Sequence, residues 1–182
     1  MRRGITVIAG RFRGRKLNSL KDPILRPLLA RSRKSLFDIL GSFVEGKSFL
    51  DLYAGVGTVG IEALSRGASE VHFVECNKKV LRVLKKNIEK LEEKKRVKVF
   101  EMRVEDFIRF FKKKYDIVFL GPPYKDGINT GIVEKLEEFL NKKSIVILQH
   151  HVGQKLPLKI GERLCLKRKK IYGKTALSFY SF

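Results

Sequence analysis

The stretch Asp51–Gly60 reads DLYAGVGTVG, and it decides the fold. Gly55, Gly57 and Gly60 form the pattern G-x-G-x-x-G, which joins a strand to a helix by a tight turn and lets a nucleotide approach the backbone. The apolar residues at its start predict a strand over Ser48–Leu52. Taken alone, the pattern fits several adenosine-containing cofactors, a dinucleotide among them, and also a turn that binds nothing.

Strand and helix patterns alternate along the rest of the chain. Further strands are predicted at 70–75, 96–100, 116–120 and 144–149, and helices at 58–66, 77–91, 105–111 and 132–140. Two final β-rich stretches, 163–172 and 175–182, predict a hairpin around Gly173. We therefore expect a Rossmann-like α/β domain over residues 46–182, with a mostly parallel seven-stranded sheet that ends in a β-hairpin.

Acidic residues at the strand ends narrow the choice of cofactor. Asp51 precedes the glycines, where a carboxylate can meet the cationic amino group of S-adenosylmethionine (SAM) but would repel a pyrophosphate. Glu75 ends the next strand and can accept hydrogen bonds from ribose hydroxyls, as in dinucleotide sites. Glu105 and Asp106 follow the third strand and fit either an adenine amino group or a helix N-terminus. The predicted SAM site comprises Asp51, Tyr53, Gly55, Gly57, Glu75, Cys76, Glu105 and Asp106.

A proline-rich loop follows the most apolar strand. Leu120–Tyr124 reads LGPPY, in which the two prolines lack N–H donors and leave carbonyls free to accept. Tyr124 could stack on a flipped-out base, although an ordinary proline-rich turn is the alternative. An exocyclic amine needs acceptors on its N–H groups to turn its lone pair toward a methyl group, so the predicted catalytic loop is Gly121, Pro122, Pro123 and Tyr124.

The net charge indicates a polyanionic partner. The chain has 40 Lys and Arg against 19 Asp and Glu, a net charge of +21, which favours nucleic acid over an anionic membrane or a merely lysine-rich surface. A basic N-terminal extension, residues 1–45, is predicted to form a β-hairpin around 10–14 and a helix that Ser32 caps and Gly41 ends. The candidate residues for contact with nucleic acid, which the family resemblance given below specifies as RNA, are Arg11, Arg13, Arg15, Lys16, Arg26, Arg31, Arg33 and Lys34.

Other features argue against metal, membrane and secretion. Cys76 and Cys165 lack metal-type spacing, and the His150-His151 pair has no neighbouring Cys or carboxylate pattern. No signal core or apolar run of membrane-spanning length is visible. The sequence therefore predicts a cytoplasmic monomer that binds neither metal nor membrane.

These motifs resemble the RsmD-type methyltransferases, which methylate a guanine N2 of small-subunit (16S) ribosomal RNA. The resemblance covers nearly the whole chain and is carried by VIAGRFRGRKL (Val7–Leu17), Arg26-Pro27, RSRKSLFDIL (Arg31–Leu40), FLDLYAGVGTVGIEALSRGA (Phe49–Ala68), FVE (Phe73–Glu75), LGPPY and YGKTALSFY (Tyr172–Tyr180). It implies the fold of a class I SAM-methyltransferase and the activity of a SAM-dependent rRNA (guanine-N2-)-methyltransferase. It also implies that the N-terminal extension contacts RNA and that the protein acts late in assembly of the small subunit.

One residue departs from the family pattern. The family has Asp-Pro-Pro-Tyr or Asp-Pro-Pro-Phe, and Gly121 stands where that Asp is expected. A missing acceptor can cost roughly 10²–10³ in rate, unless another carboxylate such as Asp126 replaces it. Two alternatives therefore stay open: a non-catalytic SAM- and RNA-binding assembly factor, and an adenine-N6 methyltransferase of nucleic acid.

Overall fold

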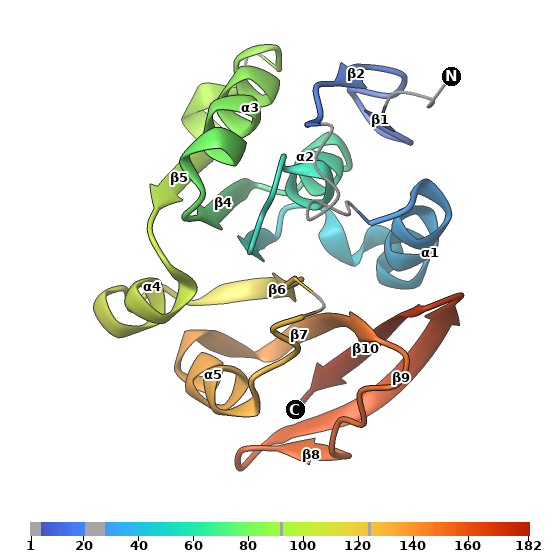
Figure 1. The fold of residues 1–182 in the computed structure, drawn as a ribbon, viewed down its shortest axis with the longest axis vertical. Coiled ribbons are helices and arrows are strands. Elements are labelled where there is room, and N and C mark those ends of the chain that lie inside the picture. The colour runs from blue at the N-terminus through green and yellow to red at the C-terminus, as the bar shows by residue number, and fades with distance from the viewer. Residues whose placement is uncertain (1–4, 21–27, 92, 124) are drawn as a thin grey trace.

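A computed structural model describes residues 5–20, 28–91, 93–123 and 125–182 of the chain, and Figure 1 shows it as a ribbon. Its main sheet has eight strands in the order β5-β4-β3-β6-β7-β10-β9-β8. The strands are β3 (Ser48–Leu52), β4 (Glu70–Glu75), β5 (Val97–Glu101), β6 (Tyr115–Leu120), β7 (Leu140–His151), β8 (Lys159–Ile160), β9 (Leu164–Tyr172) and β10 (Thr175–Ser181). Strands β3 to β7 pair in parallel, and β7, β10, β9 and β8 pair antiparallel. The predicted α/β class, mostly parallel sheet and terminal hairpin are confirmed.

The sheet has one strand more than the sequence predicts. The additional strand is β8, only two residues long, which pairs with the edge of β9 and buries Ile160. A strand this short shows no alternation that a sequence pattern could reveal.

Helices cover both faces of the sheet. They are α1 (Ala30–Leu40), α2 (Thr58–Ser65), α3 (Lys78–Glu89), α4 (Val104–Phe110) and α5 (Thr130–Lys135), with 3-10 turns at Gly41–Val44, Lys94–Arg96 and Leu136–Phe139. Side chains of β3 alternate between two cores: Phe49 packs with α1, α2 and α3, whereas Leu50 packs with α4 and α5. The central strands are therefore buried on both faces, as their apolar sequences predict.

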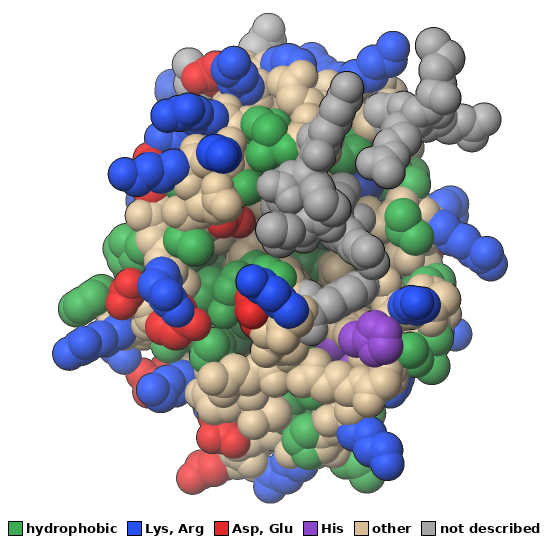
Figure 2. All heavy atoms as spheres, in the orientation of Figure 1, with side chains coloured by type: hydrophobic (Ala, Val, Ile, Leu, Met, Phe, Trp, Pro, Cys, Tyr) green, Lys and Arg blue, Asp and Glu red, His purple; other side chains and the backbone are tan. Residues whose placement is uncertain are grey.

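Helix α3 separates an apolar side from a basic one. Val80, Leu81, Leu84 and Ile88 are buried, and the Asn77 side chain caps the helix by accepting from Lys79 and Val80 N–H. The exposed side carries Lys78, Lys79, Arg82, Lys85, Lys86 and Lys90. Figure 2 shows Lys and Arg side chains gathered over this part of the molecule, at the upper left.

The N-terminal extension packs into the same core as the sheet. The predicted hairpin forms from β1 (Ile5–Thr6) and β2 (Lys16–Leu17), and it lies next to α2 in Figure 1. Its Phe12 is buried, with its backbone N–H donating to the Ser65 hydroxyl at 2.9 Å. The division of the chain at residue 45/46 stays a prediction, but the described part of the extension shares its core with the sheet.

The start of α1 differs from the prediction. The helix begins at Ala30 with no side-chain cap, and Ser32 lies buried in its first turn rather than capping it. Gly41 does follow its last residue, as predicted. No helix among the described residues is long and apolar enough to cross a membrane.

Candidate active site

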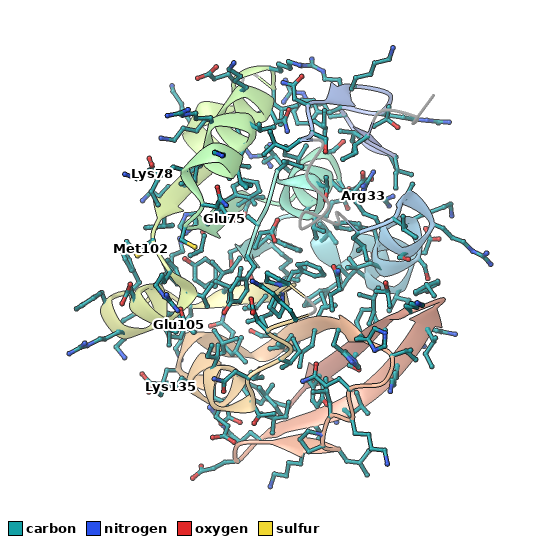
Figure 3. All side chains as sticks on the ribbon, viewed as in Figure 1. Arg33, Glu75, Lys78, Met102, Glu105 and Lys135 are labelled. Carbon is teal, nitrogen blue, oxygen red and sulfur yellow. The ribbon has the colours of Figure 1, made fainter. Side chains whose placement is uncertain are left out.

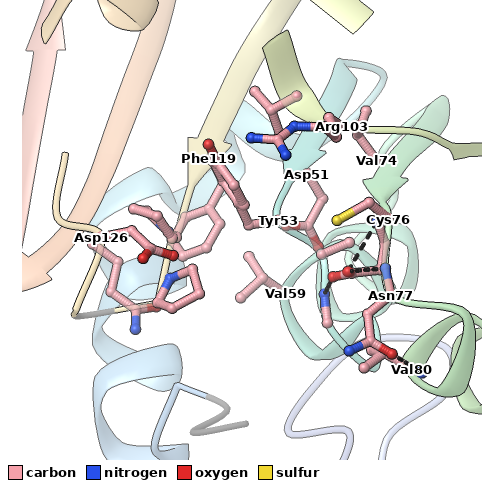
Figure 4. Close-up of a pocket in the computed structure, with 18 of the residues that line it drawn as sticks. Asp51, Tyr53, Val59, Val74, Cys76, Asn77, Val80, Arg103, Phe119 and Asp126 are labelled. Carbon is pink, nitrogen blue, oxygen red and sulfur yellow. Dashed lines mark hydrogen bonds between the residues drawn. The ribbon is translucent and has the colours of Figure 1, made fainter. Parts of the chain in front are cut away.

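A cavity of about 830 Å³ lies where the parallel strands end. Its walls come from the residues that follow β3, β4, β5 and β6, and from the end of β7. In the close-up of Figure 4, Phe119 and Asp126 lie on one side, and Cys76, Asn77 and Val80 lie on the other. The cavity therefore occupies the edge of the sheet at which α/β proteins of this type bind their ligands.

The glycine turn between β3 and α2 is packed too tightly for larger residues. Gly57 has a left-handed backbone (φ 85), and a Cβ there would lie 2.5 Å from the Leu84 side chain. A Cβ on Gly60 would overlap the Phe73 ring. The absence of these side chains lets α2 start close against the sheet, so that its first amides face the cavity side of the turn.

Asp51 lies at the bottom of the cavity and is almost fully buried. One carboxylate oxygen accepts the Gly60 N–H at 2.8 Å. Burial raises the pKa of Asp51 to about 8, and the nearby Glu75 carboxylate adds to the rise, while the Gly60 hydrogen bond opposes it. A buried carboxylate with a raised pKa is stabilised by a cation, so Asp51 fits the positively charged end of a ligand.

Glu75 organises the loops on either side of it. Its carboxylate accepts N–H groups of Gly55, Cys76 and Asn77, each at 2.9 Å. A carboxylate has about four acceptor positions, so it can still accept from a ligand hydroxyl. Cys76 is exposed beside it, and burial together with the Glu75 charge raises the pKa of its thiol.

The other predicted cofactor residues divide into two groups. Tyr53 and Glu105 line the cavity, and the Tyr53 hydroxyl donates to Glu105 at 3.5 Å. Tyr53 is also the one described non-glycine residue with a left-handed backbone (φ 59), and burial raises its pKa to about 12 with Glu105 adding to the effect. Asp106 does not line the cavity: it is exposed in the first turn of α4, where the helix dipole favours a carboxylate. The structure therefore does not bring Asp106 to the cavity, and its assignment to the cofactor stays a prediction without support from this geometry.

The LGPPY loop forms the opposite wall. Gly121, Pro122 and Pro123 line the cavity, whereas Tyr124 lies outside the described residues. The Pro123 carbonyl accepts N–H groups of Asp126 (2.9 Å) and Gly127 (3.3 Å). No described residue donates to the Pro122 carbonyl, so within the described part of the loop this carbonyl has no protein partner.

Among the cavity residues that the sequence did not predict, two lie beside Gly121. The ring of Phe119 lies beside Gly121. Gln149 lines the cavity from near the carboxyl end of β7. Gln149 had a signal: it is the polar residue that ends an apolar strand at the functional edge of a parallel sheet.

The predicted RNA-binding residues are mostly exposed, with one correction. Arg11, Arg13, Arg15, Lys16, Arg31 and Lys34 are exposed, and Arg26 lies outside the described residues. Arg33 is buried: its guanidinium donates to the Thr6 carbonyl at 2.6 Å and pairs with buried Glu62 at 3.6 Å. Figure 3 shows it well apart from Glu75, Met102 and Glu105. It fastens α1 to the hairpin and to α2, and is not available to phosphate.

Metal binding would require several ligating side chains close together. No group of three or more metal-ligating side chains occurs in the part of the chain that the structure describes. His150 is buried and bonds to Ser178 at 2.9 Å, which accounts for it as a packed residue.

The strand order and the cavity together define an α/β protein with the class I SAM-methyltransferase fold. The chain belongs to the RsmD/YlbH family, described as "Conserved hypothetical protein 95", which matches residues 5–181. It is 31% identical to ribosomal RNA small subunit methyltransferase D of Escherichia coli (strain K12) over 178 residues, which cover 97% of this chain and 89% of that protein. The resemblance seen in the sequence is thereby confirmed.

Solved structures agree with this assignment. The Escherichia coli protein yhhF is 30% identical, with a TM-score of 0.87 and 97% of each chain covered. An RNA methyltransferase from Salinibacter ruber, in complex with S-adenosyl-L-homocysteine, is 13% identical with a TM-score of 0.61, covering 85% of this chain and 92% of that one. At that identity the second match shows the fold alone.

Proposed function

We propose that this protein is a SAM-dependent ribosomal RNA methyltransferase, and that it modifies the N2 of a guanine in the small-subunit (16S) RNA. The observation that carries the proposal is the pairing of two walls across one cavity. Asp51 and Glu75 form a wall suited to SAM, and the proline loop after β6 forms a wall suited to a base. The family's named members with this activity and the structures that hold S-adenosyl-L-homocysteine support it.

The residues present fit the cofactor. The cavity volume of about 830 Å³ suits a nucleotide-sized ligand. Asp51 would hold the cationic amino end, Glu75 the ribose hydroxyls, and the apolar side chains Val74 and Val80 would cover the adenosine. When bound, SAM supplies an electrophilic methyl group.

The protein's part in the reaction is to position the base and exclude water. The Pro122 carbonyl is free to accept an amine hydrogen, and the rigid proline backbone keeps it in place without reorganisation. The apolar Phe119 ring lies beside Gly121 and gives this side of the cavity an apolar surface. Both features lower the cost of bringing a neutral amine to the methyl group.

The surface supports an RNA partner. The hairpin joins the basic side of α3 directly, because Arg15 donates to the Lys90 carbonyl and Arg11 pairs with Glu93. Arg13 and Lys16 are exposed on the same hairpin. A continuous basic surface of this kind suits the phosphate backbone of a folded RNA. We further propose a cytoplasmic monomer.

Labelling tests the proposal. Purified protein is incubated with tritiated SAM and small subunits that lack this modification, and the RNA is digested to nucleosides. We expect label in N2-methylguanosine. Label in N6-methyladenosine would favour the adenine alternative.

Gly121 specifically favours a second candidate, a non-catalytic assembly factor. Calorimetry with SAM, run beside the labelling, distinguishes the two candidates. Binding of SAM without any transfer would identify the assembly factor, whereas the absence of SAM binding would reject both.

A further inference from the structure

Gln149 stands directly beside the glycine that departs from the family pattern. Strands β6 and β7 pair in parallel with Leu120 opposite Leu148, so the next residues, Gly121 and Gln149, emerge together at the carboxyl edge of the sheet. Both line the cavity.

The Gln149 carboxamide occupies the space that a side chain at position 121 would use. A Cβ built on Gly121 would lie 3.3 Å from Gln149 Oε1 and 2.9 Å from the Phe119 ring. The absence of a side chain at 121 therefore leaves room that the amide fills.

The amide faces the cavity and has no protein partner among the described residues. Gln149 is 7% exposed as a residue, and in the part of the chain that the structure describes no group forms a hydrogen bond with its side chain. Because Gln149 lines the cavity, its amide is open to a ligand there, which can supply a hydrogen-bond partner.

We propose that Gln149 is a catalytic residue of this protein, and that its Oε1 accepts an N–H of the target amine in place of the carboxylate missing at Gly121. This inference rests on the proposed function. In the transfer, the amine nitrogen bonds to the methyl carbon as the carbon–sulfur bond breaks with its electrons on sulfur, which leaves as a neutral thioether. The methylated nitrogen then carries a positive charge and releases one proton to solvent water, because an amide is too weak a base to take it. Oε1 and the Pro122 carbonyl hold the two amine hydrogens, which turns the lone pair toward the methyl group.

The amide also defines which edge of a base it can read. A carboxylate only accepts, so it suits two adjacent N–H groups, such as N1–H and N2–H of guanine. A carboxamide accepts with oxygen and donates with nitrogen, so it suits an amine beside an unprotonated ring nitrogen. On guanine that edge is N2 with N3.

The test exchanges the acceptor between the two positions. Gln149→Met keeps the length of the side chain and removes its hydrogen-bonding atoms, and we expect transfer to fall by roughly 10²–10³ with the dissociation constant for SAM unchanged. In the double variant Gln149→Met with Gly121→Asp, a carboxylate is restored beside the same site, and we expect at least tenfold of the rate to return. Recovery of this kind would not follow from a merely structural role.

Several outcomes would overturn the inference. If Gln149→Met transfers as fast as the wild type, or if the double variant stays as slow as the single one, Gln149 is not the acceptor and the proposed function stands. If the wild type transfers nothing, the proposed function fails and this inference with it. Should Gln149→Met fail to fold, Gln149→Asn withdraws the amide by one methylene, and full activity of that variant would equally reject the inference.

Discussion

The turns after β3 and β6 both place glycine at the carboxyl edge of neighbouring strands, but for different reasons. Gly57 and Gly60 are required by the backbone and by packing against Leu84 and Phe73. Gly121 has no left-handed backbone, and a Cβ on it would meet mainly the edge of the Phe119 ring. The first turn needs glycine to form, whereas the backbone at Gly121 allows other residues provided that the Phe119 ring shifts.

The two walls also differ in charge. The wall around the first turn holds the carboxylates of Asp51 and Glu75, which suit a cation and hydroxyl donors. The wall around the second turn presents a neutral amide and a carbonyl, from Gln149 and Pro122. The comparison teaches that the wall beside β3 and β4 offers carboxylates, whereas the two groups assigned to the amine on the wall beside β6 and β7 are neutral acceptors.

The largest expected effect is a loss of stability when a glycine of the turn after β3 is replaced. If that loss did not occur, the two turns would not differ. Gly60→Ala places a methyl group into the Phe73 ring and should lower the free energy of unfolding by about 1–3 kcal/mol. Gly57→Ala should act similarly, because a left-handed backbone costs about 1–2 kcal/mol for a residue with a Cβ. The matched control is Gly121→Ala, which should lower it by less than about 1 kcal/mol. Urea unfolding followed by circular dichroism measures all three, and equal losses would show that the turns are not different.

A second change sharpens the comparison on the cofactor side. Asp51→Asn keeps an oxygen for the Gly60 N–H and removes the charge, so we expect SAM binding to weaken by about ten- to a hundredfold at pH 8.5, in line with a lost charge-assisted hydrogen bond. Calorimetry at that pH measures it. An unchanged affinity would remove Asp51 from the ligand's cationic end.

The pH dependence follows from the same group. Because burial raises the pKa of Asp51 to about 8, the wild type must lose a proton to form the charged pair, and SAM affinity should rise up to about pH 8 by as much as tenfold per pH unit. The free energy of unfolding of the ligand-free protein should carry the opposite slope, falling as the pH rises from about 4 to about 8, since ionising the buried carboxylate costs stability. Asp51→Asn should remove both slopes.

The cofactor side could be predicted from sequence because local patterns specify it. Asp51, the glycines and Glu75 all belong to two consecutive strands and the turn between them, where spacing fixes position. Tyr53 and Cys76 follow from the same reasoning and also line the cavity. Asp106 lies outside the cavity lining whereas its neighbour Glu105 lies in it, because a sequence pattern places strand and helix boundaries only to within a position or two.

The errors and omissions arise where distant segments meet. Arg33 looked like an RNA contact because its neighbours are basic, but its partner Glu62 comes from α2, and no local pattern reveals that contact. Gln149 is opposite Gly121 only through the pairing of β6 with β7. A strand register can be inferred only after the strand order is known.

The smallest expected effect decides between two acceptors on the base side. Asp126 also lines the cavity, and it could replace the missing carboxylate in the loop. Among the described residues, Asp126 makes a hydrogen bond through its backbone, whose N–H donates to the Pro123 carbonyl at 2.9 Å. The residue itself is exposed. An exposed carboxylate must give up its water to bind an amine, so we expect Asp126→Asn to keep transfer within about threefold of the wild type. Single-turnover labelling, with Gln149→Met run in parallel, measures it. A loss of a hundredfold in Asp126→Asn would mean that the base side, like the cofactor side, works through a carboxylate, and the difference between the two walls would disappear.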